Sequence, residues 1–129
     1  TYSGTMSVDQ VIRGEEALKM IKSANSLNED PKEGYEYLLA KVSIKISNNK
    51  NKDAKVDVSP VFFTLVSSQG KDYEPVFVVD PDPSIESSLY EGASHTGWVT
   101  FQVEKNDQNP LITYGRKYDG TGGVWFATK

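Results

Sequence analysis

Carboxylates are the most abundant side chains in this sequence that could act in catalysis or metal binding, and several of them gather in two loops. The acidic loop residues are Glu29, Asp30, Glu33, Asp80, Asp82 and Glu86. Paired carboxylates beside a groove hydrolyse glycosidic bonds, and six or more oxygens hold Ca²⁺. Neither loop has the Asp-x-Asp-x-Asp-Gly pattern of a calcium loop, and sequence spacing defines no groove. We therefore predict solvated turns and no metal site.

His95 is the only histidine, and the chain has no cysteine. A histidine base needs a nucleophile within reach and usually an orienting carboxylate. Ser94 and Thr96 flank it, but successive residues of a strand point to opposite faces. The missing cysteine excludes disulfides, thiolate catalysis and cysteine metal sites within these residues. We predict a histidine at the start of a strand, no cofactor, no catalytic residue and no enzymatic activity.

A third candidate is the glycine-rich stretch GRKYDGTGG at residues 115–123. A phosphate-binding loop leads into the N-terminus of a helix. This stretch leads into VWFAT, which reads as a strand, so we predict a hairpin loop. Glycine-rich loops that carry aromatic residues often contact partners. Tyr118 and Asp119 are therefore predicted binding residues.

Aromatic residues are plentiful, and they suggest a second surface. Phe63, Phe101 and one of Trp125 and Phe126 are expected in the core. The positions of Tyr35, Tyr37, Tyr73, Tyr90 and Trp98 are left open. If several of them line one outer sheet face, they form an amphipathic binding surface, and Trp98 is our predicted binding residue there. In the alternative, a helix covers that face.

Helical spacing is clear only in residues 15–25, where Ala17, Leu18, Ile21 and Ala24 form an apolar stripe. The acidic residues at its start and Lys22 near its end match the helix dipole. Asn25 is predicted as a left-handed cap.

Period-two alternation is clearest in residues 35–47, where one face carries the apolar residues Leu38, Ala40, Val42, Ile44 and Ile46. Residues 56–66 are predicted as its partner strand across a turn that contains the solvated stretch 50–55, with Pro60 at an edge or bulge. Other strands are expected in residues 2–12, 71–79, 85–90, 95–103, 111–114 and 124–128. Many short strands and one helix predict a mainly β, antiparallel β-sandwich with a short N-terminal helix.

Length and charge limit the function classes. The 129 residues fit one domain, 1–129, and the net charge of −4 disfavours nucleic acid. No apolar run approaches the ~20 residues of a spanning helix. Because the chain opens with Thr1, we expect a mature or trimmed fragment whose signal peptide lies upstream.

The segments FTLVSSQGKDYEP (63–75) and GASHTGWVTFQV (92–103), with EYLLAKVSIKIS and LITYG in the same order, resemble the family called domain of unknown function 4352. That family is similar in fold to the mycobacterial immunoprotective secreted antigen. The resemblance covers roughly residues 1–128. It implies an immunoglobulin-like sandwich and an extracellular lipoprotein of a Gram-positive bacterium, anchored to the cell membrane through a cysteine upstream of Thr1. It supplies no catalytic residues.

Three functional hypotheses remain at this point. The first is a cell-envelope module that binds a protein, peptide or polymer through its loops or a sheet edge. The second is an envelope-glycan hydrolase that uses scattered carboxylates, which requires a concave pocket holding two of them. The third is a structural accessory domain without a ligand. The first is our prediction; the partner and the oligomeric state stay open.

Overall fold

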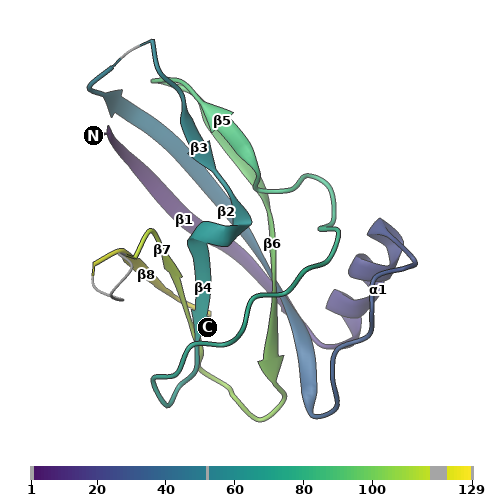
Figure 1. Ribbon diagram of the computed structural model, residues 1–129. Helices are drawn as coiled ribbons and strands as arrows, with labels where there is room; N and C mark the ends of the chain where they lie inside the picture. Colours follow the sequence, from purple (N-terminus) through teal and green to yellow (C-terminus); the bar gives the residue numbers. More distant parts are fainter. Residues whose placement is uncertain (1, 52, 117–121, 129) are drawn as a thin grey trace.

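The chain forms three antiparallel sheets around one apolar core, and a helix packs outside the longest sheet (Figure 1). This computed structural model describes residues 2–51, 53–116 and 122–128. The strands are β1 (Tyr2–Arg13), β2 (Tyr35–Asn49), β3 (Val56–Val58), β4 (Phe63–Val66), β5 (Ser87–Leu89), β6 (Ser94–Glu104), β7 (Leu111–Tyr114) and β8 (Val124–Ala127). The helices are α1 (Glu15–Ala24) and the 3-10 helix η1 (Pro60–Phe62).

Strand order places β2 at the centre of the fold. The long sheet has the order β1-β2-β6, a second sheet has the order β4-β7-β8, and β3 pairs with β5 alone. β2 pairs with β1 from Asn49 to Leu38 and with β6 from Tyr35 to Lys45. Strands β4 and β6 are consequently edge strands, each with one side turned away from its own sheet.

The main core lies on one face of β2. The predicted alternation is confirmed, because Leu38, Ala40, Val42, Ile44 and Ile46 are all buried. They belong to one cluster with side chains from β6 and from both other sheets. Phe63 and Phe101 are also in this cluster, as predicted.

The opposite face of the same sheet is covered by α1. Ala17 and Ile21 are fully buried and form a second cluster with Leu39 and Trp98. The predicted helix is therefore confirmed, although Ala24 of its stripe is exposed. The predicted cap was wrong: Asn25 has an extended backbone (φ −158°, ψ 118°). Its amide still donates to the Ile21 carbonyl, so the helix ends without a left-handed residue.

The prediction for residues 56–66 was wrong in its pairing. This stretch does not pair with β2, because β3 pairs with β5 and β4 pairs with β7. Pro60 opens η1 between the two strands, and the Ser59 hydroxyl accepts a hydrogen bond from the Val61 amide. A proline has no amide for a ladder, so the chain turns there and changes sheets. The end of β2 at Asn49 is thus followed by a strand of another sheet, β3, rather than by the second arm of a hairpin.

Residues 71–79 also differ from the prediction of a strand. Only Asp72 makes a bridge, with Val66, and the rest of the segment is extended without regular strand pairing. The hairpin between β7 and β8 is confirmed by their antiparallel pairing. Among the described residues, no helix is long and apolar enough to cross a membrane.

The close approach of residues 83–85 to β6 requires glycine at position 97. The Trp98 amide donates to the Pro83 carbonyl (2.8 Å), and the Ile85 amide donates to the Trp98 carbonyl (3.1 Å). A Cβ atom at Gly97 would lie 2.4 Å from the Ser84 carbonyl carbon and oxygen. Backbone atoms cannot move aside as a flexible side chain would. Any larger residue at position 97 must therefore push residues 83–85 away from β6.

Gly97→Ala should therefore lower the free energy of unfolding by about 2–3 kcal/mol, the cost of overpacking a tight contact. Urea denaturation measures this change, and the exposed Ser94→Ala in the same strand is the control. Equal stability of the two variants would contradict the contact.

Candidate functional site

The segment from Tyr73 to Asp80 runs from the C-terminal end of β4 towards α1 (Figure 1). At one end the Tyr73 amide donates to the Leu65 carbonyl (2.8 Å). At the other end the Thr100 hydroxyl donates to Asp80 Oδ1 (2.6 Å). The segment is thus attached to both edge strands, β4 and β6, but pairs regularly with neither.

A groove of about 900 Å³ lies between this segment and the edge strands. Phe63 and Leu65 of β4 and Phe101 of β6 line it as buried side chains. The lining also includes two strongly exposed side chains, Val61 (75% exposed) and Phe77 (88% exposed). We call this feature the β4–β6 groove.

Alternation along the segment explains why Phe77 is exposed. Val76 and Val78 pack against the cluster beneath α1, which contains Trp98. In an extended chain the residues between them face the other way. Phe77 and Val79 are accordingly exposed, Val79 at 50%.

Asn28 holds the segment to the end of α1. Its side-chain amide donates to the carbonyls of Ile21 (3.0 Å) and Val79 (2.9 Å), and its Oδ1 accepts from the Val79 amide (2.9 Å). The residue is 8% exposed. This side chain therefore does for the Val79 backbone what a neighbouring strand would do.

The charged side chains that line the groove are Asp72, Glu74 and Asp80, and no basic residue of the described chain is among its lining. Asp72 is paired with Arg116 (2.8 Å). Burial raises the pKa of Asp80 above its ordinary value, although the hydrogen bond from Thr100 acts in the opposite direction. The groove is thus apolar with an acidic character.

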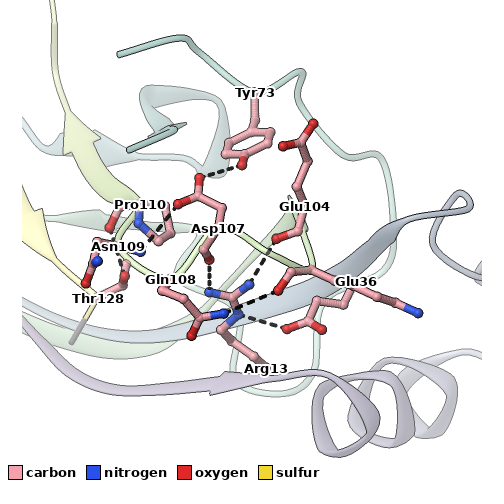
Figure 2. Close-up of polar contacts among 10 residues, drawn as sticks. Arg13, Glu36, Tyr73, Glu104, Asp107, Gln108, Asn109, Pro110 and Thr128 are labelled. Carbon is pink, nitrogen blue, oxygen red and sulfur yellow. Dashed lines mark hydrogen bonds and ion pairs between the residues drawn. The ribbon is translucent and has the colours of Figure 1, made fainter. Parts of the chain in front are cut away.

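A polar network anchors the other end of the segment (Figure 2). Tyr73 Oη donates to Asp107 Oδ2 (2.6 Å). On the other side of Asp107, Arg13 Nη1 donates to its carbonyl (2.6 Å), and Nη2 donates to the Glu104 carbonyl (3.2 Å). Arg13 Nε also forms an ion pair with Glu36 (2.9 Å). The end of β1 is therefore tied to the β6–β7 loop, and that loop to Tyr73.

Asp107 is 6% exposed and ionises easily despite its burial. Burial raises its pKa, but hydrogen bonds from Tyr73, Ser68 and Asn109 outweigh this and lower the pKa below the ordinary value. A polar depression of about 310 Å³ lies here. Since the Asp107 carboxylate is already hydrogen-bonded within the protein, we interpret this network as structural.

A third depression, of about 800 Å³, is lined by Tyr2, Phe62 and Tyr114 together with polar residues around Asn49. Phe62 and Tyr114 pack edge to face, with ring centroids 6.3 Å apart. The Asn49 side-chain amide donates to the Ala54 carbonyl (2.9 Å). Two exposed aromatic side chains, Tyr2 and Phe62, line this depression, whereas three exposed apolar side chains line the β4–β6 groove, so it is the weaker candidate.

The predicted binding residues have different outcomes. Trp98 is only 7% exposed and lies beneath α1, so the alternative of a covering helix describes this face, and the indole offers little surface to a partner. Tyr118 and Asp119 lie outside the described residues. His95 is at the start of β6, as predicted, and its Nε2 lies 2.7 Å from the Ser84 carbonyl oxygen.

The acidic loops do not converge on a metal site in the described part of the chain, where no three His, Cys, Asp or Glu side chains are placed to hold an ion. The groove was not predicted from the sequence. The one sequence feature that points to it is the apolar run Val76–Val79, which lies in the predicted strand 71–79.

Comparison with known proteins identifies the family. The sequence matches the family described as a domain of unknown function, DUF4352, over residues 6–123. The chain belongs to this family. The resemblance inferred from the sequence is therefore confirmed.

The DUF4352 domain is also similar to a solved structure, that of a "putative lipoprotein", YcdA, from Bacillus subtilis subsp. subtilis strain 168. The TM-score is 0.62 at 16% identity, and the similarity covers 98% of this chain. It covers 37% of YcdA, so this chain spans well under half the length of that protein. No curated protein matches the sequence.

Asn28→Ala should lower the free energy of unfolding by about 2–3 kcal/mol, because three hydrogen bonds are lost at ~1 kcal/mol each. Hydrogen exchange should accelerate at the Val79 amide, whose acceptor is removed. The control is Ser26→Ala, an exposed position in the same loop. Unchanged protection at Val79 would show that other contacts hold the segment.

Asp80→Asn should raise the free energy of unfolding at pH 7. A carboxylate whose pKa is raised in the folded state binds its proton more tightly there, so its charge destabilises the fold at pH values above that pKa. The advantage of the variant should shrink as the pH falls towards the ordinary value of 3.8, where the wild-type carboxylate becomes protonated. Urea denaturation across this range measures the difference, with the exposed Asp82→Asn as control. A less stable variant at pH 7 would contradict the assignment.

Proposed function

We propose that this DUF4352 domain is a non-catalytic binding module of the bacterial cell envelope, and that it binds its partner in the β4–β6 groove. One observation carries the proposal: Val61, Phe77 and Val79 are exposed around a single groove with an apolar floor. Exposed apolar surface costs solubility unless a partner covers it, so its concentration at one place marks an interaction site.

The proposed location rests on similarity. The family resemblance and the likeness to YcdA support a lipoprotein displayed outside the membrane. We propose that this domain is the extracellular part of such a protein, with its anchor upstream of Thr1. The net charge of −4 supports a partner other than nucleic acid.

We further propose that the fold is an immunoglobulin-like sandwich. Both three-stranded sheets direct side chains into the same core cluster, which supports two facing layers. β3 and β5 contribute to that cluster as a short additional pair.

The groove is also where the hydrolase hypothesis must be weighed, because three carboxylates line it. Asp80 has the raised pKa that a general acid needs. Asp72, however, is paired with Arg116, and the Asp80 carboxylate accepts a hydrogen bond from Thr100. The apolar floor and rim favour burial of a partner side chain over positioning of a sugar and a water. Binding is therefore the better supported activity.

Selection from phage-displayed random peptides of roughly ten residues, which reach ~33 Å when extended, tests the proposal. Wild-type protein should enrich peptides whose binding is weakened at least about tenfold, ~1.4 kcal/mol, by Phe77→Ser. The matched control is Tyr90→Ser, because Tyr90 is another exposed aromatic residue (52% exposed) but does not line the groove.

Both variants should unfold at the same urea concentration as the wild type, since neither side chain is buried. Enriched peptides that bind Phe77→Ser and the wild type equally would place binding elsewhere. Failure to enrich any peptide would contradict a peptide-binding groove.

A further inference from the structure

The proposed groove has features that specify its occupant. We propose that the β4–β6 groove binds an extended peptide segment in which apolar side chains flank a lysine or arginine, and that Asp80 receives the cation while Glu74 adds to the negative potential of the groove. This inference rests on the proposed function and adds the chemistry of the partner. It follows from the charge of the groove, the acceptor capacity of Asp80 and the edge of β6 that lies along the groove at Thr100.

Charge is the first observation. The groove presents three acidic side chains and, within the described residues, no basic lining residue. Arg116 already neutralises Asp72. Among the described residues, Glu74 and Asp80 have no ion-pair partner, so the negative charge of the groove is concentrated in them.

Asp80 is suited to receive a cation. Its Oδ1 is fixed by the Thr100 hydroxyl at 2.6 Å, so the carboxylate is held in place before a ligand arrives. A carboxylate can accept about four hydrogen bonds, which leaves capacity for an ammonium or guanidinium group. Burial disfavours the charge of Asp80 in the unliganded protein, and a bound cation would compensate for that cost.

The edge of β6 favours an extended peptide over a compact ligand. The Trp98 backbone bonds to Pro83 and Ile85, on the side away from β2. Thr100 is two residues further along, so its backbone faces the same edge. Thr100 also lines the groove, where an extended chain can reach this edge.

The apolar contacts have the spacing of such a chain. Phe77 and Val79 are two residues apart in an extended segment. Both line the groove, and both side chains are exposed to solvent. A facing peptide with apolar side chains at every second position would meet both. Asp80 lines the same groove, so a lysine or arginine of that peptide can reach its carboxylate with its long side chain while its methylene groups stay on apolar surface.

Three synthetic peptides test the inference by fluorescence anisotropy. They share an alternating valine–threonine sequence of roughly ten residues and differ only in a central lysine, norleucine or glutamate. We expect the lysine peptide to bind the wild type about tenfold more tightly than the norleucine peptide, and the glutamate peptide to bind most weakly. Added salt should reduce the advantage of lysine, because screening weakens a charge contact.

Variants then locate the contact. Asp80→Asn should reduce the preference for lysine over norleucine to less than about twofold, ~0.4 kcal/mol, and Glu74→Gln should reduce it by a smaller factor, because Glu74 acts on the cation only through the negative potential of the groove. Asp82→Asn is the matched control, because Asp82 is exposed in the same acidic stretch but does not line the groove. Phe77→Ser should weaken the lysine and norleucine peptides by the same factor.

The outcomes separate the two proposals. Equal affinity for lysine and norleucine, with binding that still depends on Phe77, would overturn the cationic partner and keep the groove. Binding of no peptide would overturn both. Sedimentation of the protein alone completes the test: a dimer that Phe77→Ser dissociates would show that a second copy occupies the groove, and it would overturn the peptide.

Discussion

Burial of both faces of β2 is the constraint on which the rest of the structure depends. One face supplies the main core, and Tyr37 and Leu39 on the other face form a second cluster with α1. Because strand pairing fixes which residues share a face, a shift of one residue would exchange the two sets. The helix, the other two sheets and the segment from Tyr73 to Asp80 all take their positions from this register.

The groove is a consequence of how this segment is attached. Val76 and Val78 complete the second cluster, which fixes the segment beside β6. Side chains rather than a strand ladder hold its ends: Asn28 bonds to Val79, and Asp107 accepts from Tyr73. The segment from Tyr73 to Asp80 packs on the second cluster and pairs regularly with neither β4 nor β6, so a groove remains between it and these strands. The same arrangement that completes one cluster thus leaves a groove lined by buried side chains of the other.

Much of the fold was predictable from local pattern. The alternation in residues 35–47 and the helical stripe from Ala17 to Ile21 are strong signals, because burial on one face selects them residue by residue. Pairing was not predictable in the same way. Residues 56–66 have the composition of a strand, but Pro60 divides them between two sheets. Composition alone does not determine with which strand each part pairs.

The candidate site was beyond sequence analysis for a related reason. The run Val76–Val79 looks like any buried strand. The packing of Val76 and Val78 on the second cluster, together with the bonds from Asn28, 51 residues away from Val79 in the sequence, determines which face is left in solvent. Trp98 shows the converse: an aromatic residue predicted on a surface is covered because α1 packs there. The exposure of Phe77 and the burial of Trp98 both result from contacts between segments that are distant in the sequence, and residue types alone do not specify such contacts.

The acidic residues of the groove oppose self-association of the protein through its exposed apolar site. Exposed edge strands and apolar patches promote association between identical chains, and charged side chains at such edges oppose it. Glu74 and Asp80 lie among the apolar groups of the groove, so a second copy would bring like charges together there. The same charges would attract a peptide of opposite sign. Selectivity against self-association and selectivity for a cationic partner would then have one physical origin, the sign of the charge placed beside Phe77.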